Sequence, residues 1–218
     1  FDSLRTPSLL VVSIVLGFLG GVSASGQWPL WMLWSNATPF GQTDPQFGLD
    51  VSYWVFTYPF VRFVLGYAFA VMLLALIASA VVNYLYGGLR FQGDGERVTR
   101  GARAQMSFIV GVLMLFKAAG YWLDRLGLAT RDDEFVLGYT GLKYVDVNAL
   151  LPAKTILTFI ALIVAVLFFI NIFRSIWRVA VAGFVLMAAS ALVIGGIYPA
   201  IVQQFQVRPS ELVKEQEF

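Results

Sequence analysis

Five long apolar segments constrain this chain more than any other feature. They cover residues of about 9–25, 54–86, 106–123, 151–173 and 176–202. A helix needs about 20 mostly apolar residues to cross the roughly 30 Å hydrocarbon core of a bilayer. The sequence therefore predicts an all-α membrane protein with a bundle of five transmembrane helices. Pro152 is expected in the first turn of the fourth helix, and Pro199 is expected to kink or end the fifth.

Composition narrows the class of protein further. Of the 218 residues, 59% are hydrophobic and 13% charged, whereas soluble domains have about 45–50% and 25%. This balance argues against a soluble enzyme, a disordered chain and a nucleic-acid-binding protein. The chain contains no Cys and no His, so these residues supply no disulfide, no Cys- or His-ligated metal site and no Ser-His-Asp triad. No cofactor and no metal site are expected.

Charges in alternate loops predict the orientation. The loops on one side contain seven basic and three acidic residues, a net charge of +4. Those on the other side contain six basic and ten acidic residues, a net charge of −4. Because positive loops stay in the cytoplasm, the N-terminal end is predicted to be cytoplasmic and the C-terminal end extracytoplasmic. Residues 1–205 are then a transmembrane helical domain of the cell membrane, and 206–218 begin an extracytoplasmic region.

The first outer loop carries Trp28, Trp31 and Trp34 at three-residue spacing. Residues 26–35 reach only about 15 Å as a helix, half of a bilayer core. They are expected to form a short helix along the outer interface rather than another span. The tryptophans are interpreted either as an aromatic belt or as a surface that gathers lipid.

Two basic residues fall inside the predicted spans, Lys117 and Arg62. Each needs a partner, because an unpaired charge in hydrocarbon is costly. For Lys117 the structural interpretation is a lysine that extends toward the outer interface and pairs with Asp124; the alternative is a site for an anionic lipid headgroup or an ion. For Arg62 the candidate partners are Asp50 and Asp44, which are also typical turn and cap residues. The alternative for Arg62 is again a site for an anionic lipid headgroup or an ion.

Other polar residues have mainly structural interpretations. Asn83 and Asn171 are expected to form hydrogen bonds between helices. The cluster at 131–134 (Arg-Asp-Asp-Glu) lacks the spacing of a calcium loop and is interpreted as a solvated outer loop. A cytoplasmic basic stripe is expected to fix topology and hold anionic headgroups, or to bind a cytoplasmic partner; it consists of Arg90, Arg97, Arg100 and Arg103.

Three longer strings carry a family resemblance. They occupy residues 41–60 (GQTDPQFGLDVSYWVFTYPF), 148–154 (NALLPAK) and 195–209 (GGIYPAIVQQFQVRP). With them the chain resembles UPF0182, an uncharacterised family of large bacterial multi-pass membrane proteins. The resemblance implies two hydrophobic segments before Phe1 and a large extracytoplasmic region after Phe218. Ser210 departs from the usual Asn, but both residues cap helices well. The family supplies no catalytic residues.

These observations favour a non-enzymatic envelope protein that anchors an extracytoplasmic domain and binds or transfers lipid. The alternatives are a channel or transporter, an assembly scaffold, and a membrane-embedded enzyme acting on lipid or peptide. The enzyme is disfavoured because the spans lack paired Asp and a Gly-x-Ser-x-Gly elbow. Expected partners are membrane lipids, the protein's own extracytoplasmic domain and a second copy or another envelope protein, but no nucleic acid.

Overall fold

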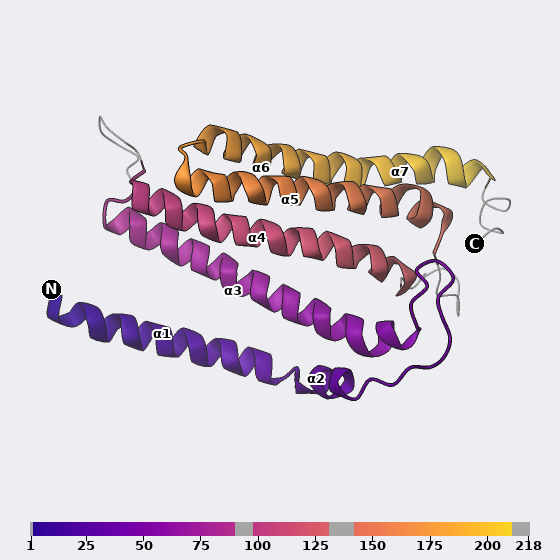
Figure 1. Ribbon diagram of the computed structural model, residues 1–218, viewed down its shortest axis with the longest axis horizontal. Helices are drawn as coiled ribbons and strands as arrows, with labels where there is room; N and C mark the ends of the chain where they lie inside the picture. The colour runs from indigo at the N-terminus through magenta and orange to yellow at the C-terminus, as the bar shows by residue number, and fades with distance from the viewer. Residues whose placement is uncertain (1, 90–97, 131–141, 211–218) are drawn as a thin grey trace. The chain divides into compact units, whose positions relative to one another are not determined.

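The structure, a computed structural model, describes residues 2–89, 98–130 and 142–210 (Figure 1). Within these ranges the regular structure is helical, apart from isolated bridges at Thr43–Asp50 and Leu89–Val98. Four helical stretches of the described part are long and apolar enough to cross a membrane: Tyr53–Leu85, Arg100–Thr130, Asp146–Phe173 and Trp177–Val207. The all-helical fold is thus confirmed. The first predicted span lies in helix α1 (Asp2–Ser25), of which Ser13–Ser25 is a shorter apolar helix, so the fifth span stays a prediction.

The chain divides into two compact units, residues 1–63 and 64–218. The second unit contains most of α3 (Tyr58–Leu85) and all of α4 (Arg100–Leu126), α5 (Leu151–Phe173), α6 (Trp177–Leu192) and α7 (Tyr198–Val202). Helices α4, α5 and α6 run side by side in alternating directions (Figure 1). The second unit is therefore an antiparallel helical layer built around α5.

The core of this unit is the contact between α4 and α5, where small residues allow a close approach. Ala118, Ala161 and Ala165 are almost completely buried. At Gly111, an added Cβ atom would lie 3.0–3.3 Å from three ring atoms of Phe169. Small residues have the same role between helices in membranes, where backbones pack closely and van der Waals contacts drive association.

The structure describes four π-helical turns, and each is followed by a proline at the same distance along the chain. The four π-turns are Tyr53–Thr57, Asp146–Leu150, Val193–Ile197 and Gln203–Val207, and a proline stands two residues after each. In each case the residue just before the proline donates its backbone N–H to a carbonyl five residues earlier. A proline lacks an N–H and clashes with the carbonyl four residues before it, and the wider π-turn relieves that clash.

The sequence-based expectations about proline are met in part. Pro152 stands in the first turn of α5, as expected, and a π-turn at Asp146–Leu150 precedes it. A π-turn also separates α6 from α7 just before Pro199, but Pro199 does not end the helical stretch, which continues to Val207.

In the first unit, α2 (Trp28–Ser35) forms the short helix that was expected over 26–35. Whether it lies along a membrane interface stays a prediction. After α2 the chain folds into a loop with positive φ at Gly41 and Gly48, a conformation that favours glycine. This loop leads into the π-turn at Tyr53.

Candidate functional site

An apolar cleft of about 430 Å³ lies within the second unit. Helices α3, α4, α5 and α6 all contribute to its walls. Of its lining residues, Lys117 alone is charged or polar, and the others are aliphatic or aromatic: Phe69, Leu73, Leu76, Val110, Leu113, Met114, Phe168, Trp177, Val181, Phe184 and Met187. The surface of the cleft is wholly apolar, and Lys117 contributes the carbon stem of its side chain to it.

Lys117 lies toward one end of this cleft. Its Nζ atom is 5.0 Å from the centre of the Tyr121 ring, one helical turn closer to the C-terminal end of α4. That separation is within the range of a cation–π interaction. Tyr121 itself is buried, while Lys117 is exposed. The ring of Tyr121 therefore holds the ammonium group at the edge of the apolar surface.

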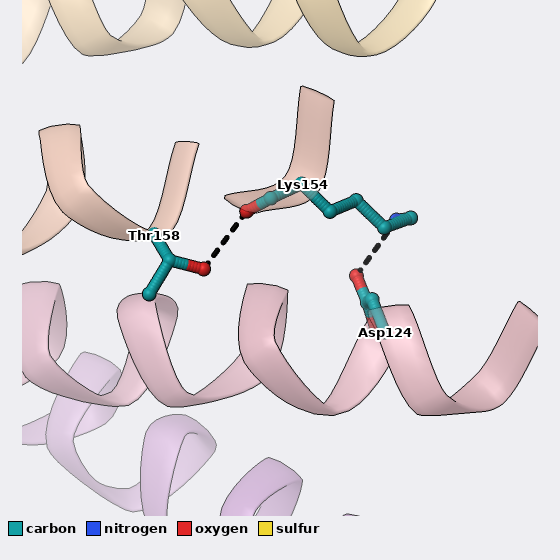
Figure 2. Close-up of polar contacts among 3 residues, drawn as sticks. All are labelled: Asp124, Lys154 and Thr158. Carbon is teal, nitrogen blue, oxygen red and sulfur yellow. Dashed lines mark hydrogen bonds and ion pairs between the residues drawn. The ribbon is translucent and has the colours of Figure 1, made fainter. Parts of the chain in front are cut away.

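The predicted pairing of Lys117 with Asp124 is wrong. The Asp124 carboxylate instead forms an ion pair with Lys154 of α5, with 3.2 Å between Oδ2 and Nζ (Figure 2). The sequence argument considered only residues on the same helix face, but the first turns of α5 lie beside the end of α4. The Thr158 hydroxyl group donates to the carbonyl oxygen of Lys154 at 2.8 Å and so adds a contact in the same turn (Figure 2).

Polar side chains also join α4 and α5 at their other end. Asn171 donates from Nδ2 to the Ser107 hydroxyl at 2.8 Å, and both residues are fully buried. One turn further on, Arg103 donates from Nη1 to the Ser175 hydroxyl at 2.8 Å. Asn83 of α3 donates to Gln105 Oε1 of α4 at 3.3 Å. The prediction that Asn83 and Asn171 bond between helices is confirmed.

The basic stripe that was predicted to be cytoplasmic is only partly within the described residues. Arg90 and Arg97 lie outside them, as does the cluster at 131–134. Arg100 is exposed in the first turn of α4, whereas Arg103 is half-buried against Ser175. Of the two described arginines, Arg100 is thus exposed, whereas Arg103 of α4 is bonded to the segment between α5 and α6.

Two candidate residues of the first unit, Trp31 and Trp34, contact Phe60. The Trp34 ring stacks on the Phe60 ring with 4.6 Å between centroids, and Trp31 meets Phe60 edge-on at 5.8 Å. Trp28 has 62% of its surface exposed. Arg62, two residues after Phe60, is exposed as well. The structure thus brings Trp31 and Trp34 together with Phe60 in one aromatic cluster, and all three tryptophans remain exposed.

Asp50 organises the loop that follows α2. Its carboxylate accepts backbone N–H groups from Phe40, Gly41 and Ser52 at 3.0, 2.8 and 2.8 Å. Hydrogen bonds from the Ser52 side chain and then from these backbone groups lower the pKa of Asp50 from 3.8 to about 2. Asp44 accepts the N–H groups of Gln46 and Phe47 in the same way. The interpretation of both aspartates as turn and cap residues is confirmed.

Sequence reasoning missed two residues, Lys154 and Phe60. Lys154 stands two residues after Pro152 at the edge of an apolar span, and an antiparallel hairpin brings that position to the end of α4. In an antiparallel hairpin the start of α5 lies beside the end of α4, and this placement identifies Lys154 as a partner for Asp124. Phe60 had no comparable signal, because its contact with α2 depends on the course of the loop.

The long apolar helices, joined by small residues and by a few polar contacts, define the class of a helical membrane protein. The chain belongs to UPF0182, described as an uncharacterised protein family, whose family model matches residues 1–218. It is 51% identical over 209 residues to a UPF0182 protein of Streptomyces coelicolor, an alignment that covers 95% of this chain and 21% of the relative.

Two further relatives show similar identity and coverage. A UPF0182 protein of Frankia alni is 49% identical over 210 residues, covering 96% of this chain and 20% of the relative. One of Kineococcus radiotolerans is 42% identical over 217 residues, covering 100% and 21%. The chain thus spans about a fifth of the length of these curated relatives. No solved structure matches it.

Proposed function

We propose that this chain is the membrane-embedded part of a non-enzymatic protein of the bacterial cell envelope, which anchors a large extracytoplasmic region and binds lipid. The anchoring role is supported by the greater length of the relatives and by the predicted extracytoplasmic C-terminal end. The lipid-binding role is supported by one observation above all, the apolar cleft with Lys117 at its edge.

The lining of the cleft favours lipid over an ion or a polar solute. A conduction pathway or transporter site needs several polar groups to replace water around its cargo. The surface of the cleft offers no polar group, since Lys117 lines it only with its carbon stem. Such a surface suits a ligand that is itself mostly hydrocarbon, because burial of apolar surface in a shaped site gains packing contacts.

Lipid analysis of the purified full-length protein tests this proposal. The lipids that remain after extensive detergent washing are quantified by mass spectrometry and compared with those on an unrelated multi-pass protein from the same membranes. We expect about one or more retained lipids per chain in excess of the control. A protein that retains no excess lipid but conducts ions in liposomes would instead support the channel alternative.

The proposed orientation has a separate test. A cysteine introduced at Thr130 should react with a membrane-impermeant reagent in intact cells, and one introduced at Gly95 should react only after permeabilisation. The reverse labelling pattern would place the anchored region in the cytoplasm and refute the anchoring role as stated.

A further inference from the structure

We infer that the cleft holds one acyl chain of an anionic phospholipid from the cytoplasmic leaflet, with the phosphate of that lipid at Arg174 and Arg178. This inference rests on the proposed lipid-binding function and names the leaflet and the class of headgroup. The argument depends on where the cleft begins, on its length, and on the charges at the end where it begins.

The cleft begins at Trp177, the first residue of α6. Arg103 in the first turn of α4 donates to Ser175, two residues before Trp177. The start of α4, the end of α5 and the start of α6 therefore lie at one end of the second unit (Figure 1). The predicted orientation assigns this end to the cytoplasmic side. Tryptophan is typical of the membrane interface, where its ring meets the headgroups.

The length of the cleft fits the acyl chain of one leaflet. Along α6 the lining residues run from Trp177 to Met187, about 15 Å at 1.5 Å per residue, which is half of the roughly 30 Å hydrocarbon core. With the predicted orientation, the walls extend from the cytoplasmic interface to the middle of the bilayer. Because the surface of the cleft is wholly apolar, it suits an acyl chain rather than a headgroup.

Basic side chains gather where the cleft begins. Arg174 and Arg178 stand three residues before and one residue after Trp177, and both are exposed. Arg178 lies about 60° around α6 from Val181, and Val181 is a residue of the cleft wall. The guanidinium group of an arginine donates two parallel hydrogen bonds to a phosphate. A phosphate bound by these arginines would have its acyl chain at the mouth of the cleft.

In the described part of the second unit, no carboxylate lies at this end to balance the arginines. Its carboxylates, Asp124 and Asp146, stand where α4 ends and where the helical stretch containing α5 begins, at the opposite end. The start of α6 adds to the attraction for an anion, because Ile176 at the N-cap provides no side-chain hydrogen bond to the first turn. The charge of this end thus favours a phosphate without a compensating cation.

The cleft is also accessible from the side. Leu73 of α3, together with Val181 and Phe184 of α6, lines it while remaining exposed. Both helices are mostly unburied within the described part of the chain. An acyl chain can thus enter between α3 and α6 without disturbing the contact between α4 and α5.

A competition between two lipids tests the headgroup. Delipidated full-length protein in detergent is mixed with equal amounts of phosphatidylglycerol and phosphatidylcholine with identical chains, and the bound ratio is measured by native mass spectrometry. Wild type should prefer phosphatidylglycerol. Arg178→Gln should lower that preference about fivefold, the usual effect of one basic residue on an anionic lipid. Adding Arg174→Gln should lower it further, whereas Arg178→Lys alone should keep most of it.

Arg208→Gln is the matched control for charge. Arg208 is an exposed arginine just beyond the other end of the helical stretch Trp177–Val207. Its replacement removes the same charge as Arg178→Gln, but far from the start of the cleft, and should leave the lipid preference of wild type unchanged. An equal fall in the two variants would show a response to net charge alone and overturn the placement of the phosphate.

A matched pair of variants on α6 tests the position of the chain. Val181→Trp fills the cleft, whereas Val179→Trp adds the same bulk about 200° around the helix, at an exposed residue that does not line the cleft. Val181→Trp should lose bound lipid of either headgroup, and Val179→Trp should bind like wild type. If Val181→Trp does not purify as a folded protein, Leu73→Phe replaces it, with Leu74→Phe at an exposed residue outside the cleft as its control.

The outcomes separate this inference from the proposed function. Lipid bound by wild type with no headgroup preference, or with a preference that survives the loss of both arginines, overturns the placement of the phosphate but leaves lipid binding intact. Equal binding by the Val181→Trp and Val179→Trp variants overturns the cleft as the site of the chain. Reversed labelling of the cysteines at Thr130 and Gly95 overturns the cytoplasmic leaflet. No lipid on wild type refutes lipid binding itself.

Discussion

Helices α4 and α5 differ sharply from α3 and α6 in how they pack, although all four are apolar enough to cross a membrane. In the best spanning window of each, 39% of residues are buried for the stretches containing α4 and α5, against 6% for α3 and 11% for α6. Mean hydropathy does not explain the difference, because α4 has the lowest value of the four and α5 the highest. Within the described residues, hydrophobicity thus identifies the helices that can span a membrane but does not determine which of them form the buried core.

Small and polar residues explain which helices form the core. The α4–α5 contact contains Gly111, Ala118 and Ala161, and polar side chains join the two helices at both ends. Ser107 to Asp124 and Lys154 to Asn171 are equal intervals of 17 residues, or roughly 25 Å of helix. The polar contacts therefore stand about one hydrocarbon thickness apart. Helices α3 and α6 form the sides of the cleft.

The largest expected effect comes from disrupting the close approach of α4 and α5. Gly111→Leu forces a side chain into the Phe169 ring, which lies 3.0–3.3 Å from the Cβ position. We expect a loss of about 1–3 kcal/mol of stability, the usual cost of overpacking, seen as a lower Tm in detergent. Gly66→Leu on α3 is the matched control, because its added Cβ meets no atom within 4 Å. Equal destabilisation by the two variants would contradict the distinction between core and flanking helices.

A smaller effect is expected for the buried hydrogen bond between Asn171 and Ser107. Asn171 Oδ1 is buried and has no hydrogen-bond partner among the described residues, so Ser107→Ala leaves the whole amide unpaired and should be destabilising. Asn171→Leu removes the amide, and the double variant should lose less stability than the sum of the two single variants. We expect a coupling energy of about 0.6–1.7 kcal/mol, the range found between membrane helices. It is measured by a double-mutant cycle of unfolding in detergent.

If the stability losses of the Ser107→Ala and Asn171→Leu variants simply add in the double variant, the two side chains do not cooperate. Packing of small residues alone would then hold α4 against α5. The same cycle on Asn83 and Gln105 is the comparison from a flanking helix. Their hydrogen bond is longer, at 3.3 Å, and Gln105 is exposed, so their coupling energy should be smaller.

The sequence predicted the helical fold, the extent of the apolar segments and the roles of Asn83, Asn171, Asp44 and Asp50, because these depend on local patterns. It was wrong where a neighbouring element decides the outcome. Asp124 pairs with Lys154 across two helices rather than with Lys117 along one. Pro199 was expected to kink or end the last span, but helical structure continues past it to Val207 through α7 and a further π-turn. The cleft joins residues from four helices, so no local pattern identifies it.

The smallest effect is expected in the loop before α3, and it is local. The folded-state pKa of Asp50, about 2, is below its ordinary value of 3.8. The ionised carboxylate therefore stabilises the loop above about pH 4, and this stabilisation is lost as the pH falls toward 2.

Amide exchange of Phe40, Gly41 and Ser52, corrected for the intrinsic effect of pH, should accelerate over that interval. Exchange in the middle of α4, around Leu113, should not change, because the acidic residue of that helix, Asp124, lies near its C-terminal end. Asp50→Asn should exchange faster already at neutral pH and lose the acid transition. A wild-type loop that is insensitive to acid between pH 4 and 2 would show that the three backbone hydrogen bonds do not hold it in place.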